Sequence, residues 1–217
     1  MHKIILLKKI EAKTICGSLT STSKMPCKSY SLPTEACITG AKMAKLKGSI
    51  CSSCYANKGF YKMYSKTIKP AQNARLQSIN DPLWVSGMVS MIGKDEFFRW
   101  HDSGDLQSLD HLAKIAQVAK ETPKTMHWLP TREYGIVKEY IDAFGALPSN
   151  LIVRLSAMYP DQSVKIPKSL QGFDNIAASN VHTSSPQGFE CKAPSQDGAC
   201  MDCRVCWSNK TVSYALH

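Results

Sequence analysis

The chain has 217 residues and a formal net charge of +10. This length fits one ordinary domain, and it is enough to bury a core without disulfides as staples. The longest apolar run, residues 4–7, is far shorter than the roughly 20 residues that span a bilayer, and it is also too short for a signal peptide. We therefore expect a globular, cytoplasmic protein with no membrane span.

The positive charge is concentrated at the N-terminus. Residues 1–80 contain 14 Lys and Arg but only two acids, whereas residues 81–217 contain 13 Lys and Arg and 15 acids. Lysines at 42, 45, 47, 58, 62, 66 and 69 alternate with Tyr55, Tyr61 and Tyr64. Such a basic segment favours nucleic acid as a partner, and a merely solvated surface is an equal alternative.

We expect a single domain, 1–217, with three parts: a basic segment (27–80), a β/α core (81–185) and a C-terminal segment (186–217). In chain order, residues 3–7 suit a strand and residues 17–28 a loop. Residues 55–78 have helical spacing with a break or kink at Pro70. Asp81 is placed to cap a helix over residues 84–92.

From residue 96 onward, strands and helices alternate. Strands are expected at 96–101, 125–129, 151–157 and 175–179, and helices at 106–120 and 133–144. This alternation indicates βα units and a parallel sheet. The strands end in polar residues, as in a β/α barrel, but the chain is shorter than the roughly 250 residues of a full barrel. We therefore expect an α/β fold of the partial (β/α) TIM-barrel type.

The nine cysteines form two clusters at opposite ends of the chain. Cys191, Cys200, Cys203 and Cys206 include two consecutive C-x2-C steps, which curl a short loop around one point. Because the count is odd and no export signal is expected, metal ligation is favoured over disulfides. Four thiolates suit an iron–sulfur cluster or zinc, and this spacing favours iron and sulfur.

The N-terminal cluster contains Cys37, Cys51 and Cys54, with Cys27 as a further candidate. Three thiolates on a four-iron cluster would leave one iron open to a substrate or cofactor, whereas a fourth ligand would close the site. Cys16 has no partner at ligand spacing, so we interpret it as a buried core residue.

These motifs resemble the radical-SAM superfamily, and more closely a group of phage- and plasmid-encoded radical-SAM-like proteins. The resemblance covers residues 27–207 and rests on 30–33, 51–56, 98–105 and 200–207. It implies that Cys37, Cys51 and Cys54 hold a [4Fe–4S] cluster that binds S-adenosylmethionine, and that the C-terminal cysteines hold an auxiliary [4Fe–4S] cluster. Thirteen residues separate Cys37 from Cys51, whereas the superfamily has three.

The superfamily's element that holds the amino group of S-adenosylmethionine corresponds to Ser103, Gly104 and Asp105. Asp102, Asp105 and Arg132 are candidate catalytic residues at strand ends, and Arg154 is a candidate cofactor-binding residue within a strand. Asp105 capping the next helix, and Arg132 or Arg154 balancing an acid, are the structural alternatives. His127 and Trp128 are expected in the core, and His182 is a weaker site candidate.

The expected function is redox or radical chemistry on a nucleic acid or nucleotide, with an electron donor as partner. Two alternatives stay open. One is a zinc-stabilised, non-catalytic nucleic-acid-binding protein. The other is a barrel that keeps its clusters, does not bind S-adenosylmethionine, and acts as an electron carrier or sensor.

Overall fold

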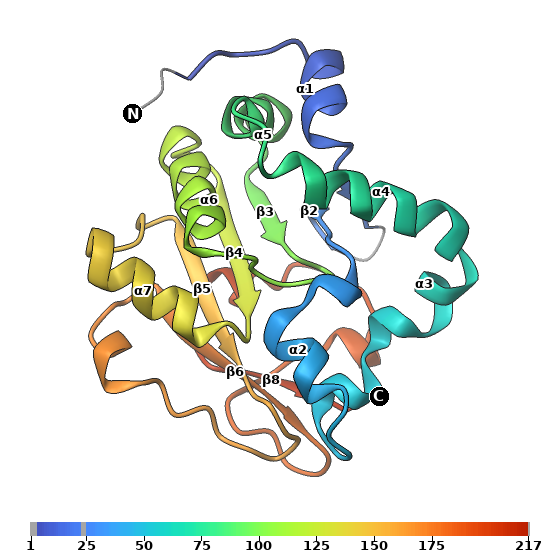
Figure 1. The fold of residues 1–217 in the computed structure, drawn as a ribbon. Helices are drawn as coiled ribbons and strands as arrows, with labels where there is room; N and C mark the ends of the chain where they lie inside the picture. The colour runs from blue at the N-terminus through green and yellow to red at the C-terminus, as the bar shows by residue number, and fades with distance from the viewer. Residues whose placement is uncertain (1–3, 23–24, 217) are drawn as a thin grey trace.

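A computed structural model describes residues 4–22 and 25–216 (Figure 1). Its centre is an eight-stranded sheet in the order β1-β2-β3-β4-β5-β6-β8-β7, in which only β1 and β2 pair antiparallel. The strands are β1 (Thr20–Ser21), β2 (Lys28–Tyr30), β3 (Phe97–Trp100), β4 (Met126–Thr131), β5 (Leu151–Ser156), β6 (Ile176–His182), β7 (Phe189–Glu190) and β8 (Val212–Ala215). In the described part of the chain, β1 and β7 do not pair with each other, so the sheet is open.

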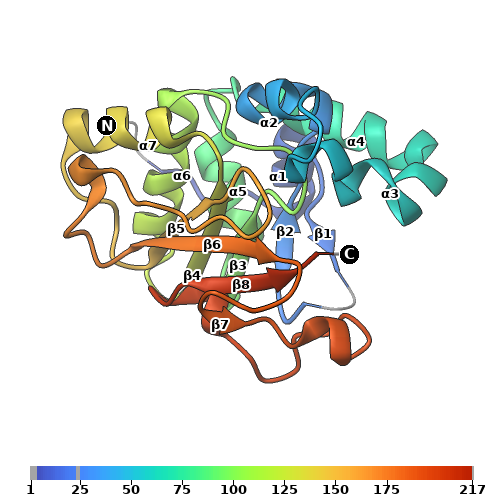
Figure 2. The same cartoon turned by 90° about the horizontal axis from the view of Figure 1, so that it is seen from below.

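The two faces of the sheet are covered differently. The α-helices are α1 (Lys9–Cys16), α2 (Ile38–Met43), α3 (Gly59–Met63), α4 (Ser65–Ser78), α5 (Trp84–Ile92), α6 (Leu109–Glu121) and α7 (Tyr134–Phe144). Helices α5, α6 and α7 lie on one face, and the C-terminal segment around β7 lies on the other (Figure 2). The sheet is therefore sandwiched between a helical layer and the segment that carries four of the cysteines.

Strand β3 shows how side chains alternate between these layers. Phe98 and Trp100 are fully buried on the helical side, where Trp100 packs against Tyr30 and Trp84. Phe97, on the opposite face, contacts Trp207 of the C-terminal segment. Because side chains of a strand alternate with period two, Arg99 shares the face of Phe97. This alternation determines which polar side chains lie on the same face of the sheet as the C-terminal cysteines.

The regular part of the sequence forms the elements that its pattern predicts. The strands expected from residue 96 onward correspond to β3, β4, β5 and β6, and the helices to α6 and α7. They pair in parallel, so the α/β prediction is confirmed. The Asp81 carboxylate accepts a hydrogen bond from the Leu83 backbone N–H at 2.8 Å in the turn before α5, but the N-cap of α5 is Leu83, so the prediction that Asp81 caps this helix was wrong.

Several further local predictions were wrong, and the expected loop at 17–28 contains β1 and the first residue of β2. Residue 3 lies outside the described residues, and residues 4–7 form no strand, because the backbone N–H groups of Ile5 and Leu7 donate to serine hydroxyls of α5. Helix α4 continues through Pro70. Helix α6 begins three residues later than expected, because the Ser108 hydroxyl caps it by accepting from the His111 N–H.

No helix in the described residues is both long and apolar enough to cross a membrane.

Candidate metal centres

Cys37, Cys51 and Cys54, hereafter the N-terminal cysteine site, converge although thirteen residues separate the first two. Cys37 precedes α2, and Cys51 and Cys54 belong to and follow the 3-10 helix η2 (Ile50–Ser53). A Cβ atom added at Gly40 would lie 3.6 Å from the sulfur of Cys37 and 3.7 Å from that of Cys51. The sulfurs of Cys37 and Cys51 therefore approach the same point beside Gly40.

Two contacts fix the segments that carry these thiols. The Glu133 carboxylate accepts from the backbone N–H and the hydroxyl of Thr39, both at 2.7 Å, and thereby caps the first turn of α2. The Ile50 N–H donates to the carbonyl of Met158 at 3.0 Å, which ties η2 to the segment after β5. The site therefore lies at the carboxyl ends of the parallel strands, where polar residues were predicted from the sequence.

Asp105 is the buried acid beside this site. Its carboxylate accepts hydrogen bonds from the Leu106 N–H, the Thr131 hydroxyl and the Arg132 N–H, at 2.6 to 2.9 Å. Burial, only partly opposed by these bonds, raises the pKa of Asp105 to about 6. Asp105 does not cap α6, since Ser108 does; it ties the end of β3 to the end of β4.

The thiols of this site lie in an apolar and acidic environment. Burial raises the pKa of Cys37 to about 12, with further contributions from Asp105, the other two thiols and Glu133. Burial also raises the pKa of Cys51, although the nearby Arg132 guanidinium acts in the opposite direction and lowers this pKa. Without a cation Cys37 and Cys51 stay protonated, so a metal would have to displace their protons.

Cys191, Cys200, Cys203 and Cys206, hereafter the C-terminal cysteine site, lie on the opposite face of the sheet from the helices. Charge on Cys203 raises the pKa of both Cys191 and Cys200, which marks these thiols as neighbours. Cys206 lies in the 3-10 helix η6 (Val205–Trp207), and its sulfur is 3.5 Å from the Tyr214 hydroxyl of β8.

Trp207 and Arg154 attach this segment to the sheet. The Trp207 indole donates to the carbonyl of Phe98 at 3.0 Å and packs edge-on against the rings of Phe97 and Trp128. Arg154, fully buried on β5, donates to the carbonyls of residues 178, 205, 206, 208 and 210 at 2.7 to 3.3 Å. In this geometry Arg154 holds the cysteine loop and is committed to backbone carbonyls.

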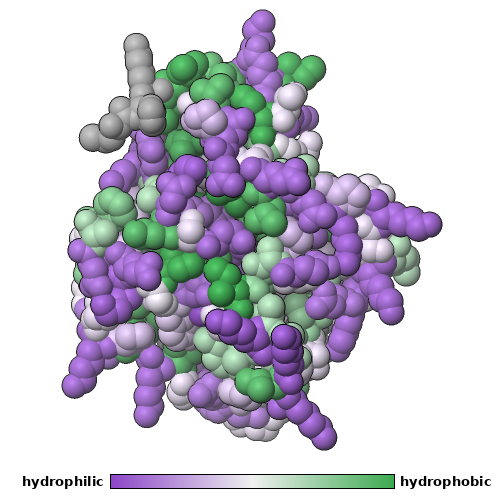
Figure 3. Space-filling model, in the orientation of Figure 1, coloured by the Kyte–Doolittle hydropathy of each residue, from purple (hydrophilic) through white to green (hydrophobic). Residues whose placement is uncertain are grey.

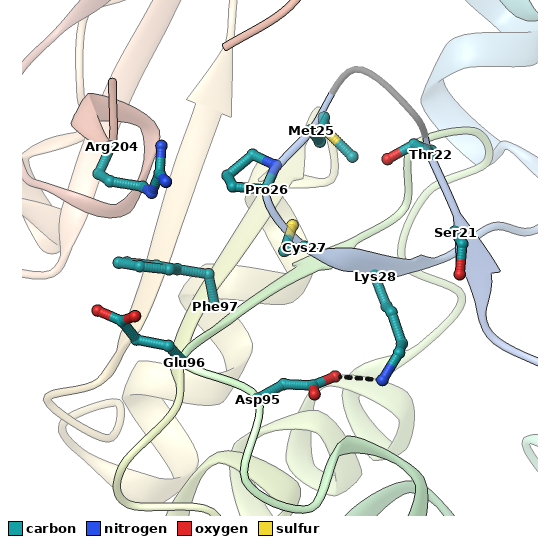
Figure 4. Close-up of a pocket in the computed structure, with 10 residues that line it drawn as sticks. All are labelled: Ser21, Thr22, Met25, Pro26, Cys27, Lys28, Asp95, Glu96, Phe97 and Arg204. Atoms are coloured by element: carbon teal, nitrogen blue, oxygen red, sulfur yellow. Dashed lines mark hydrogen bonds and ion pairs between the residues drawn. The ribbon is translucent and has the colours of Figure 1, made fainter. Parts of the chain in front are cut away.

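Cys27 lies with the C-terminal cysteines rather than with the N-terminal ones. It shares a cavity of about 330 Å³ with Arg204, the residue after Cys203, as Figure 4 shows. Burial raises the pKa of Cys27 to about 12, Arg99 lowers it, and the charge of Cys200 raises it further. The segment before β2 therefore adds a fifth thiol to this region.

The turn after β3 brings the remaining candidates together. The Ser103 hydroxyl donates to the Leu32 carbonyl at 2.9 Å, and Gln72 donates to the same hydroxyl. Gly104 has φ +78°, and a Cβ there would lie 2.5 Å from that of Leu32, so only glycine fits. The Tyr61 hydroxyl donates to Oδ2 of Asp102, and Oδ1 of Asp102 is buried without a hydrogen-bond partner among the described residues.

The histidines are mostly core residues. The Trp100 indole donates to Nδ1 of His127, so Nε2 carries the proton and donates to the Thr122 hydroxyl. Burial lowers the pKa of His127 to about 3, which keeps it neutral, and Trp128 is also buried. The core interpretation of His127 and Trp128 is confirmed. His182 pairs with the hydroxyl of Ser213 at 2.8 Å, remote from the N-terminal site in the sheet order.

Sequence reasoning missed Glu133 as a residue of the N-terminal cysteine site and Arg99 as a residue near the C-terminal one. Glu133 was predicted only as the start of a helix, and its capping of α2 joins residues 94 positions apart. Arg99 lies inside the quoted run 98–105, and strand alternation opposite the buried Phe98 and Trp100 could have indicated which face it takes.

Within the described residues, no group of three or more His, Cys, Asp or Glu side chains is arranged to hold a single metal ion. A four-iron cluster has a different requirement, because each of its thiolates binds a different iron. For a cluster, the thiols need to lie near one another, but their sulfurs do not need to point at one common metal ion.

The fold and the two sites define an α/β protein with an open, mostly parallel sheet, one group of cysteines at the carboxyl ends of its strands and a second group on the face opposite the α-helices. Residues 5–209 match the model of the family described as Gene product 88, so the chain belongs to that family. No curated protein and no solved structure matches the chain significantly.

Proposed function

We propose that this protein is an iron–sulfur protein in which Cys37, Cys51 and Cys54 hold a [4Fe–4S] cluster with one open iron. A second, auxiliary cluster is held by the C-terminal cysteine site. The observation that carries the proposal is the approach of the Cys37 and Cys51 sulfurs to one point beside Gly40, with Cys54 near enough to act on both thiols. Two consecutive C-x2-C steps support the second cluster.

The sheet topology is compatible with a partial (β/α) barrel of the radical-SAM type. Six parallel strands, β2, β3, β4, β5, β6 and β8, follow one another in chain order, with helices on one face only. In a barrel of this kind, ligands are bound at the carboxyl ends of the strands. The N-terminal site lies at those ends, beside the residues that follow β3, β4 and β5.

When bound, a four-iron cluster with three protein thiolates supplies an electron and one coordination position to a small molecule. The protein's own residues then orient that molecule. The orphaned Oδ1 of Asp102 can accept a hydrogen bond from a cationic group, such as the ammonium of S-adenosylmethionine. The Asp105 carboxylate already accepts three hydrogen bonds, and one of them holds the backbone of Arg132 near Cys51. The Glu133 carboxylate holds the first turn of α2.

Anaerobic purification followed by iron, zinc and acid-labile sulfide analysis tests the proposal. We expect about eight irons and eight sulfides per chain, the content of two [4Fe–4S] clusters. Formation of 5′-deoxyadenosine from S-adenosylmethionine under reducing conditions would then separate an enzyme from an electron carrier or sensor. About two zincs without sulfide would overturn the proposal in favour of a zinc-stabilised binding protein.

A nucleic acid or nucleotide is the partner that the surface favours. The seven lysines between residues 42 and 69 are all exposed, and one of them, Lys69, pairs with Glu35. They lie along α2, α3 and α4 beside the N-terminal site, where hydrophilic side chains project from the surface (Figures 1 and 3). Exposed Tyr55 offers a ring for base stacking.

Charge reversal of two of these lysines tests this partner. We expect Lys58→Glu with Lys62→Glu to weaken binding of single-stranded DNA or RNA and to reduce its salt dependence by about two phosphate contacts. Lys165→Glu with Lys168→Glu, in the exposed segment before β6, is the matched control. Equal losses in both double variants would argue against a defined nucleic-acid surface.

A further inference from the structure

Residues 34–48, hereafter the cysteine arm, carry Cys37 and Gly40 on a segment that lies outside the core. None of the residues of the arm is buried, whereas Leu32 before it and Ser49 after it are buried, with exposed fractions of 0% and 2%. Helix α2 forms the middle of the arm and lies at the outer rim of the molecule in Figure 2. The packing of apolar side chains therefore does little to hold the arm in place.

Each end of the cysteine arm is fixed to a segment that follows a strand. The backbone N–H of Leu32 donates to the carbonyl of Ser103 after β3 at 2.9 Å, and the N–H of Ile50 donates to the carbonyl of Met158 after β5 at 3.0 Å. Gly48, at the second end, has φ +82°, a conformation that favours glycine. The two ends are thus fixed, and the contacts of the arm itself decide where Cys37 lies.

The cysteine arm makes few polar contacts with the rest of the protein. Apart from bonds with Pro33 and Ser49 at its ends, the hydrogen bonds and ion pairs of the described residues connect it to three side chains, which are Asn57, Lys69 and Glu133. The contacts with Asn57 and Lys69 are exposed, and exposed polar pairs contribute little stability. Glu133 is therefore the main polar attachment of the arm to the α/β core.

The core holds the Glu133 carboxylate in a fixed position. Glu133 is only 6% exposed, and its two oxygens accept from the backbone N–H and the hydroxyl of Thr39, both at 2.7 Å. The backbone N–H of Glu133 donates to the Thr131 hydroxyl oxygen at 3.0 Å, and this hydroxyl donates to Asp105 at 2.6 Å. Because hydrogen bonds to a charged acceptor are about twice as strong as neutral ones, the pair of bonds to Thr39 is a firm attachment.

The attachment point lies next to the residues that form the N-terminal cysteine site. Thr39 stands between Cys37 and Gly40 in the first turn of α2, and the sulfurs of Cys37 and Cys51 approach the same point beside Gly40. Cys51 lies beyond the second fixed end, so it does not belong to the arm. Without the bonds to Glu133, the turn that carries Cys37 keeps only exposed contacts and is free to move away from Cys51.

We propose that the cysteine arm opens and closes over the N-terminal site, and that Glu133 is the positioning residue that holds it closed. The movement is argued from the contacts of the arm, and what it controls rests on the proposed function. In the closed arm Cys37 joins Cys51 and Cys54, and in the open arm it leaves them, which exposes a cluster at this site to solvent. Glu133 acts through Thr39 and touches no reacting atom.

Hydrogen–deuterium exchange of the anaerobically purified protein, measured by mass spectrometry, tests the role of Glu133. In Glu133→Ala we expect the amides of residues 38–46 to exchange about tenfold faster or more, with α6 and β5 unchanged. Thr39→Val loses only the hydroxyl bond and should give a smaller increase, whereas Thr39→Ser keeps both bonds and should match wild type. Glu139→Ala is the matched control, because Glu139 is exposed on the same helix, α7.

Iron release to a chelator tests whether the arm controls the site. The N-terminal cluster would hold about four of the roughly eight irons. In Glu133→Ala we therefore expect about half of the iron to be released about tenfold faster than in wild type, and the other half at the wild-type rate. Thr39→Ser should release all of its iron as wild type does.

Two results would overturn the inference: equal exchange of the arm in Glu133→Ala and Glu139→Ala, or faster exchange of the arm with iron release unchanged. Where Glu133→Ala exchanges faster throughout the chain, Thr39→Val decides, and the absence of an increase confined to the arm would count against the inference. A wild-type protein without labile sulfide would instead overturn the proposed function, while exchange of the arm would still test the role of Glu133.

Discussion

The N-terminal cysteine site lies beside two buried carboxylates, whereas the C-terminal site lies among three arginines. Asp105 and Glu133 act on Cys37, and Arg132 opposes them only at Cys51. Arg99, Arg154 and Arg204 act on Cys200 or Cys206, and the half-buried Glu190 acts on Cys191.

The charge of the side chains around each site matches the number of thiolates that the site would carry. With three thiolates a [4Fe–4S]²⁺ cluster has a net charge of about −1, and with four about −2. The more negative group would meet the more positive surroundings. Under the proposed function, the acidic surroundings would favour a cationic ligand at the N-terminal site, and the basic surroundings would favour a closed cluster at the C-terminal site.

The largest expected effect comes from removing one ligand of each site. Cys54→Ala and Cys203→Ala should each lose one cluster and keep about four irons and four sulfides. Cys16→Ser is the control, because Cys16 is buried in the core and donates to the Trp84 carbonyl, a bond that serine can keep. Iron and sulfide analysis measures all three. A Cys54→Ala protein with its full iron complement would contradict the two-site comparison.

The next effect concerns the attachment of the C-terminal loop. Arg154→Leu leaves five backbone carbonyls, in one buried and four partly buried contacts, without this donor, so we expect the free energy of unfolding to fall by about 3 kcal/mol. The C-terminal cluster should be lost while the N-terminal one stays. Arg132→Leu removes a single side-chain bond, to the Ala157 carbonyl, and should cost about 1 kcal/mol. Urea unfolding distinguishes the two, and equal losses would refute the assigned role of Arg154.

A smaller change tests the space beside the N-terminal thiols. Gly40→Ala places a Cβ 3.0 Å from that of Cys37 and close to two sulfurs, so we expect reduced iron at this site. Gly135→Ala in α7 meets nothing within 4 Å, and it should stabilise the fold by about 0.5 kcal/mol with iron unchanged. Iron content and thermal unfolding of both variants give the result. Full iron in Gly40→Ala would remove the main support for a cluster there.

The smallest effect should come from Cys27→Ser. Because Cys27 lies beside Cys200 and Arg204, we expect an altered resonance spectrum for the C-terminal cluster and an unchanged one for the N-terminal cluster. A change confined to the N-terminal signal would instead support Cys27 as a fourth N-terminal ligand.

Prediction from sequence succeeded where a segment is long and regular. The interior of α6 and the apolar run of β5 were found because their patterns match one period over many residues. Strand β2 has only three residues, and it is defined by pairing with β3, about 70 residues later in the chain. Helix α4 passes through Pro70 because Gln72 and Arg75 bond to Ser103 and Ser31, contacts that outweigh a local helix breaker.

By itself, the sequence determined the alternation of strands and helices, the two groups of cysteines and the excess of charge at the N-terminus, because these depend on spacing and composition along the chain. Only the tertiary structure decided that Cys37 meets Cys51, that Cys27 lies with the C-terminal thiols, and that Glu133 caps α2. Those relations depend on which face each strand presents and on contacts between distant segments, and no local pattern encodes them.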